Sequence, residues 1–307
     1  MQIMIKGTIA LIRPKNLFLL CFAQYAIKYA LLDPMGVSTI LDHIHFAILV
    51  LATCCIAAAG NIINDIFDVE TDTINKPNRV IVGKLVSEKT AYNLYFALTI
   101  IGVSLGFFLA NHIEKTGLAA LFIIISALLY LYASQLKQTV LIGNILISLL
   151  VASSIIIVGL FDLFPATTEL NQTTQTIAFK KIFDYALFAF MINLLREMVK
   201  DIEDIDGDYN SGMRTLPIVI GRDRTVFVVF ALSFIPLLSV IYYVVTYLYN
   251  YIFVVIYFLL FVVGPMVYFT IKSFNVETKA QLHLLSNVLK IIMFTGVFSI
   301  LLYIFIF

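Results

Sequence analysis

Nine long apolar segments occupy most of this chain of 307 residues, only 13% of which are charged. Soluble domains have roughly 25% charged residues, and each segment is near the roughly 20 residues that a helix needs to cross a bilayer. Because the bilayer core leaves the backbone no other hydrogen-bond partner, such segments must be helices. We therefore expect an all-α, polytopic membrane protein that forms one domain over residues 1–307. Its nine transmembrane helices are predicted at residues 16–33, 44–64, 90–111, 116–134, 139–161, 182–202, 225–246, 250–271 and 285–306.

An acidic motif of the form DxxDxxxD occurs twice, at residues 65–72 and 201–208, each time at the end of an apolar segment. On a helix, positions i, i+3 and i+7 share one face. Four predicted spans separate the two copies, so the chain returns to the same side of the membrane. Carboxylates beside a bilayer are costly and indicate a functional site. Two such faces turned toward each other would gather enough carboxylates to bind cations, and hard oxygen ligands favour Mg²⁺.

Lysine and arginine are unevenly divided between the two sides of the membrane. With the N-terminus inside, fifteen of the 20 fall in inward-facing segments, and only Lys115, Lys180 and Lys181 fall in outward-facing ones. The positive-inside rule then predicts that both acidic motifs face the cytoplasm, in a protein of the cell membrane. Lys28 falls inside the first span, and we expect its side chain to extend toward the membrane interface.

The residues around the first motif extend its polar face. Asn61, Asp65, Asp68 and Asp72 share one side of the predicted helix, and Asn64 lies about 100° away. The carboxamide oxygens would add neutral ligands that reduce repulsion between the carboxylates. The following loop carries Lys76 and Arg79, which could meet phosphate oxygens that a metal does not cover.

Polar residues also extend the face of the second motif. Its face begins at Asn193 and Glu197 and continues through the acidic motif. Arg196 and Lys200 flank that face at i, i+4 spacing, either pairing with Glu203 or Asp204 or binding phosphate. We predict catalytic roles for Asp68, Asp204 and Lys200. Contacts with the substrate are predicted for Asn61, Lys76, Arg79, Lys137, Arg196 and Arg214.

These features fit a metal–diphosphate site at the cytoplasmic rim of a hydrophobic bundle. A substrate with a diphosphate head and a long apolar tail suits such a site, and allylic prenyl diphosphates have this form. Metal and basic groups would stabilise the departing diphosphate. The allylic cation would stay in an aromatic, water-poor pocket until an acceptor attacks.

At these motifs the sequence resembles the UbiA-type intramembrane prenyltransferases, from Arg13-Pro14-Lys15-Asn16 to the final span. The resemblance implies nine transmembrane helices around a central cavity and two Asp-rich motifs that bind Mg²⁺–diphosphate. The metal ligands that it implies are Asn64, Asp68, Asp204 and Asp208, with Asp65, Asp72 and Asp201 in the same shell. The family also has a tyrosine–lysine motif after the fourth span. Here Tyr132 and Lys137 are one residue further apart than we expect for that motif.

Residues 74–79, 196–208 and 214–217 resemble the digeranylgeranylglyceryl phosphate synthase branch of that family. That branch transfers a geranylgeranyl group to the hydroxyl of a prenylated glycerol phosphate. An acceptor that carries its own phosphate needs additional cations, and the candidates are Arg13, Lys15, Lys137 and Arg214.

Other functions stay open at this point. The acceptor could be the ring of an aromatic quinone precursor, such as a hydroxybenzoate or dihydroxynaphthoate. A divalent-cation transporter would use acidic residues through the membrane depth, whereas the last three spans contain none. A CDP-alcohol phosphotransferase would show a DGxxAR sequence that this chain lacks. The expected partners are therefore a prenyl diphosphate, a lipid or aromatic acceptor and membrane lipids, with no nucleic acid.

Overall fold

A computed structural model describes residues 2–78 and 80–306, so Arg79 lies outside the described residues. Every regular element in that part of the chain is helical. The α-helices of the first half are α1 (Gln2–Ile12), α2 (Pro14–Ala26), α3 (His43–Phe67), α4 (Val69–Asn75), α5 (Glu88–His112), α6 (Ala119–Ser134) and α7 (Ile142–Val158). Those of the second half are α8 (Gln172–Glu203), α9 (Ile205–Asn210), α10 (Leu216–Ile220), α11 (Arg222–Tyr243), α12 (Ile252–Phe258), α13 (Gly264–Ser273) and α14 (Lys279–Phe298).

Short π-helical and 3-10 segments lengthen several of these helices. They are η1 (Ile27–Leu32) after α2, η2 (Thr116–Leu118) before α6, η3 (Leu136–Gln138) before α7, η4 (Gly159–Leu163) and η5 (Phe164–Ala166) after α7, η6 (Val244–Leu248) after α11, η7 (Leu259–Val263) between α12 and α13, and η8 (Ser299–Phe305) after α14. These additions give the long helices the length that a membrane requires.

Seven helices in the described residues are long and apolar enough to cross a membrane, at 43–67, 88–112, 116–134, 142–166, 222–248, 252–273 and 279–305. The all-α, polytopic class is confirmed, but the count of nine is not reached by this measure. Helices also stand at the other two predicted spans, in α2–η1 and α8. Lys28 shortens the apolar stretch of the first, and charged side chains toward both ends shorten that of the second. The central cavity stays a prediction.

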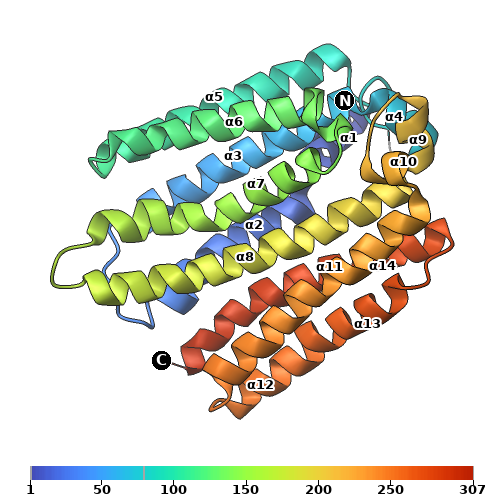
Figure 1. The fold of residues 1–307 in the computed structure, drawn as a ribbon. Helices are drawn as coiled ribbons and strands as arrows, with labels where there is room; N and C mark the ends of the chain where they lie inside the picture. Colours follow the sequence, from blue (N-terminus) through green and yellow to red (C-terminus); the bar gives the residue numbers. More distant parts are fainter. Residues whose placement is uncertain (1, 79, 307) are drawn as a thin grey trace.

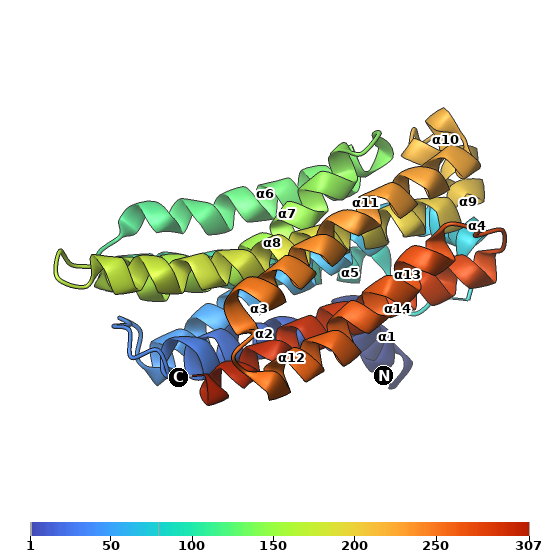
Figure 2. The same cartoon turned by 60° about the horizontal axis from the view of Figure 1, so that its bottom comes forward.

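The long helices run side by side, and the short helices α4, α9 and α10 gather at one end of the bundle (Figures 1 and 2). The chain ends at the opposite end of the bundle. In the first half α3 packs against α5 and α6, and in the second half α8 packs against α11 and α14. Contacts between α7 and α8 join the halves.

The two acidic motifs have the same backbone geometry. Asp68 is the single residue between α3 and α4, and Asp204 is the single residue between α8 and α9. Their φ and ψ angles are −88° and 0° for Asp68 and −99° and 8° for Asp204. Each long helix therefore ends at the middle aspartate of its motif, although helical backbone hydrogen bonds continue through Asp68 and through Asp204. The repeat seen in the sequence is therefore also a structural repeat.

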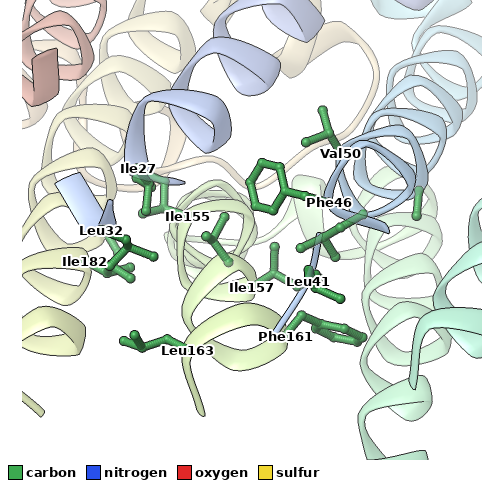
Figure 3. Close-up of a cluster of buried hydrophobic side chains, with 14 of the residues drawn as sticks. Ile27, Leu32, Leu41, Phe46, Val50, Ile155, Ile157, Phe161, Leu163 and Ile182 are labelled. Carbon is green, nitrogen blue, oxygen red and sulfur yellow. The ribbon is translucent and has the colours of Figure 1, made fainter. Parts of the chain in front are cut away.

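A buried apolar cluster closes the end of the bundle away from the motifs. Figure 3 shows side chains of η1, α3, α7, η4 and α8 meeting there, with Phe46 and Phe161 among them. Inside this region, the Nζ of Lys28 lies 2.7 Å from Oδ2 of Asp162 and 2.6 Å from the carbonyl oxygen of Leu41. The expectation that Lys28 extends to the interface is therefore wrong, because a carboxylate 134 residues away in sequence supplies a buried partner.

We predict that Asp162→Asn destabilises the protein strongly. The asparagine can still accept from the amide of Leu41, which donates to Oδ1 of Asp162 over 2.8 Å, but the ammonium of Lys28 loses its counter-charge. Breaking a buried pair in this way costs roughly 3–5 kcal/mol. Thermal unfolding in detergent would measure the loss. Asp33→Asn, at an exposed position nearby, is the matched control, and equal melting temperatures for the two variants would contradict the prediction.

Candidate active site

Asn75 connects the two acidic motifs. Its Nδ2 donates to the carbonyl oxygen of Asp204 over 2.8 Å, and its Oδ1 accepts from the amide of Gly207 over 3.0 Å. A Cβ at Gly207 would lie 2.4 Å from Nδ2 of Asn75, so glycine is required for this approach. A further hydrogen bond joins Oγ1 of Thr71 to Oγ of Ser211 over 3.1 Å. The short helices α4 and α9 are thus held against each other, and the two carboxylate faces meet.

Each of the two helix-breaking aspartates is paired with a lysine from another element. Asp68 is 5% exposed and accepts hydrogen bonds at Oδ2 from Nδ2 of Asn64, over 2.6 Å, and from Nζ of Lys137. Asp204 accepts at Oδ2 from Nζ of Lys76 over 2.5 Å. The first-motif lysine therefore binds the second-motif carboxylate, and the η3 lysine binds the first motif. Cations and carboxylates alternate across the site.

Other oxygens of the site keep unused acceptor capacity. Oδ1 of Asn64 and Oδ1 of Asp204 are buried and have no hydrogen-bond partner. Asp208 is 5% exposed. Burial, together with the negative charges of Asp204 and Asp68, raises the pKa of Asp208 to about 7. Burial and the charge of Asp68 also raise the pKa of Asp72. Binding of a cation beside Asp72 and Asp208 would favour their ionised forms.

The outer members of the predicted metal shell make contacts with other helices. Asp65 pairs with the guanidinium of Arg13, and Asp201 accepts from Nδ2 of Asn144 over 2.8 Å. The second contact joins α7 to α8. Asn61 donates to the carbonyl oxygen of Ile12 over 3.2 Å, which places its side chain against α1.

Arg196 and Lys200 pair with a residue other than those expected. Both donate to Oε1 of Glu197, over 2.9 Å in each case, so pairing with Glu203 or Asp204 is not what the structure shows. Nε of Arg196 is buried without a partner. The third basic candidate, Arg214, is placed beside η3, because its amide donates to the carbonyl oxygen of Gln138 over 2.8 Å. The loop after α9 therefore lies next to the segment that carries Lys137.

The described residues contain no group of three His, Cys, Asp or Glu side chains close enough to hold a metal ion. In the same part of the chain, Asp65, Asp68 and Asp204 are each paired with a lysine or arginine. A metal would have to replace those contacts, and the lysines would then be free to meet an anion. The predicted metal ligands stay a prediction.

Two residues of the site were not assigned to it from the sequence. Arg13 was counted only as a spare cation, and Asn75 was given no role. Arg13 separates α1 from α2 with a φ of 52°, in the left-handed region that non-glycine residues seldom adopt. Its partner Asp65 is 52 residues away. The link between Asn75 and Gly207 likewise crosses from one motif to the other, and local spacing carries no signal of it.

The fold and site together define an all-α integral membrane protein with a paired acidic site at one end of its bundle. A model of the UbiA prenyltransferase family matches residues 20–305. The chain therefore belongs to the UbiA prenyltransferase family and is a prenyltransferase, which confirms the resemblance seen in the motifs.

Individual relatives agree with this assignment. The chain is 40% identical to the digeranylgeranylglyceryl phosphate synthase of Korarchaeum cryptofilum over 57% of this chain and 56% of that protein. It is 30% identical to the synthase of the same name from Methanosphaera stadtmanae over 82% of this chain and 86% of the relative. A solved structure described as digeranylgeranylglyceryl phosphate synthase in membranes is 26% identical, with a TM-score of 0.63 and full coverage of both chains. A UbiA homologue from Archaeoglobus fulgidus bound to GPP and Mg²⁺ shares the fold at 14% identity, with a TM-score of 0.58 over 96% of this chain and 99% of that one.

We predict that Asn75→Ala separates the two motifs. The substitution removes both hydrogen bonds. The carbonyl oxygen of Asp204 keeps the amide of Asp208 as a donor over 3.1 Å, so the cost of about 1–3 kcal/mol falls on the amide of Gly207 if that group stays buried. The test places cysteines at Thr71 and Ser211 in a background without the three native cysteines. In the Asn75→Ala variant these cysteines should form a disulfide at least fivefold more slowly, which corresponds to the loss of about 1 kcal/mol. Asn78→Ala, at an exposed position in the same loop, is the control. Unchanged cross-linking in Asn75→Ala would show that this contact does not hold the motifs together.

Proposed function

We propose that this protein transfers a geranylgeranyl group from geranylgeranyl diphosphate to the free hydroxyl of geranylgeranylglyceryl phosphate. The relatives from Korarchaeum and Methanosphaera, both named for that product, support the choice of reaction. One observation of this chain carries the proposal: Lys137 pairs with Asp68 while Lys76 pairs with Asp204, across the two motifs. Alternating cations and carboxylates at the end of an apolar bundle suit a metal-bound diphosphate with a long tail.

Magnesium is proposed as the metal. The residues fit it, because the site offers hard oxygen ligands and because Oδ1 of Asn64 and Oδ1 of Asp204 are buried without a partner. The Archaeoglobus homologue bound to GPP and Mg²⁺ supports the same choice. Bound Mg²⁺ would supply neutralisation of the charge that develops on the departing diphosphate. The residues proposed to hold it are Asn64, Asp68, Asp72, Asp204 and Asp208, with Asp65 and Asp201 around them.

The basic residues would hold the leaving group. Lys76 and Lys137 already lie at the carboxylates, so they can turn to phosphate oxygens when the diphosphate arrives, forming charge-assisted hydrogen bonds. Arg79 and Arg214, in the segments that follow the motifs, are proposed as further phosphate contacts. Arg196 and Lys200 both bind Glu197, and we assign them to fixing that carboxylate below the second motif.

The reaction then follows from where charge is stabilised. The bond between the allylic carbon and the diphosphate oxygen breaks, and its electron pair leaves with the diphosphate. Preorganised cations that face this developing charge lower the barrier. The hydroxyl oxygen of the acceptor attacks the allylic carbon and forms the ether bond, and its proton passes to an oxygen of the departing diphosphate. The long prenyl chain stays among the apolar helices throughout.

The proposed location is the cell membrane, with the site facing the cytoplasm. The support is the excess of lysine and arginine on the side of the two motifs, which is the side that the positive-inside rule assigns to the cytoplasm. We also propose that residues 1–307 act as one domain, since helices of both halves build the site.

A competition between acceptors tests the proposal. Purified protein in detergent would receive geranylgeranyl diphosphate and Mg²⁺ with equal amounts of geranylgeranylglyceryl phosphate and a hydroxybenzoate. We expect mass spectrometry to find the diether lipid and no prenylated ring. Prenylation of the ring alone would overturn the acceptor and leave the donor chemistry intact. Transfer to neither would contradict the proposed function.

A further inference from the structure

Two of the three cysteines of the chain lie against each other between α2 and α3. Sγ of Cys21, on α2, is 3.1 Å from Sγ of Cys54, on α3. Both side chains are partly exposed, whereas Cys55, the next residue of α3, is buried. Successive residues of a helix point about 100° apart, so Cys54 rather than Cys55 is the residue that faces α2. Two helices that pack together thus bring two free thiols into contact.

Polar contacts on both sides of this thiol pair hold α2 in place. On one side, Oε1 of Gln24 accepts a hydrogen bond from Oγ1 of Thr53 over 2.9 Å, and Nε2 of Gln24 donates to the carbonyl oxygen of Ser154 over 2.7 Å. Gln24 is fully buried. On the other side, the guanidinium of Arg13 pairs with Asp65. The two helices therefore keep the rotation that brings the thiols together.

The thiol pair lies at membrane depth. Cys54 is near the middle of the membrane-spanning helix at 43–67. Cys21 follows Arg13 by eight positions, which is about 12 Å along the helix at 1.5 Å per residue. Charged, water-soluble redox partners such as glutathione enter an apolar layer only at a high cost in free energy. A reagent that oxidises this pair must therefore dissolve in lipid.

We propose that Cys21 and Cys54 form a reversible disulfide when they meet a lipid-soluble two-electron oxidant of the quinone class. Both S–H bonds break, and one bond forms between the two sulfurs. The two electrons and two protons that the thiols release convert the quinone to the hydroquinone. A neutral dithiol returns the pair to free thiols by thiol–disulfide exchange.

The disulfide would join two helices that meet beside the acidic site. It would connect positions 33 apart in the chain and so restrict the unfolded chain more than the folded one. Oxidation should therefore raise the melting temperature of the protein. The proposal concerns α2 and α3 alone and does not depend on which acceptor the acidic site prenylates.

Two oxidants of different solubility test the proposal on the intact protein in lipid nanodiscs. The first is decylubiquinone, whose fully substituted ring takes electrons without adding to a thiol, and the second is glutathione disulfide. After free thiols are alkylated, mass spectrometry of peptides should find Cys21 joined to Cys54, with the loss of two hydrogens, in the quinone sample. Dithiothreitol should restore both thiols. Glutathione disulfide should leave the pair reduced, and equal oxidation by the two reagents would overturn the proposal.

Serine variants identify the sulfurs that react. Cys55→Ser, one position away on α3, is the matched control and should form the disulfide as the parent does. Cys21→Ser and Cys54→Ser should form none, and quinone should leave their melting temperatures unchanged while it raises that of the parent and of Cys55→Ser. A disulfide that uses Cys55, no disulfide in the quinone-treated parent, or no rise in its melting temperature would each overturn the proposal. None of these readouts requires prenyl transfer.

Discussion

A carboxylate that leaves water needs a nearby cation or hydrogen-bond donor, and in this protein those partners come from distant helices. Asp68 is held by Lys137, Asp204 by Lys76, Asp65 by Arg13 and Asp162 by Lys28. Each pair spans more than 50 positions of the chain. Removing one partner strands a buried charge, which costs more than the pair contributes when intact. The pairs therefore fix which helices are neighbours.

The same pairs shape the acidic site that we propose as the place of reaction. Because Asp68 and Asp204 interrupt their helices in the same way, two copies of one motif present equivalent carboxylates. The clamp from Asn75 to Gly207 brings the copies together. Lys76 and Lys137 then lie at the carboxylates, while buried oxygens of Asn64 and Asp204 have no hydrogen-bond partner. A metal–diphosphate head would exchange internal ion pairs for contacts with substrate, so binding need not expose a bare carboxylate cluster.

The sequence predicts much of this arrangement because the membrane restricts the choices. Apolar length predicts helices at all nine places, and motif spacing predicts one face for each acidic cluster. The sequence does not predict which side chains form ion pairs across the bundle. Lys28 was expected at the interface because the local sequence does not reveal its partner, since Asp162 lies in η4 and becomes its neighbour only in the folded bundle. For Arg196 and Lys200 the sequence left two roles open, pairing with Glu203 or Asp204 and binding phosphate. In the structure both pair with Glu197, whose side chain is buried at 9% exposure. The π-helical segments η6 and η7 have no signal in residue spacing.

The central claim is that the two motifs act as one site, and a double-mutant cycle on binding of geranylgeranyl diphosphate in Mg²⁺ tests it most directly. Asp68→Asn and Asp204→Asn would be measured singly and together. The control is Asp206→Asn, at an exposed position of α9, the helix that follows Asp204. The account predicts that each single change weakens binding roughly 10- to 10²-fold, as for loss of one hydrogen bond to a charged group. It also predicts that the double variant loses far less than the product of the two losses, since contacting groups of one site are not additive. Losses that multiply independently, or binding near normal in both single variants, would contradict it.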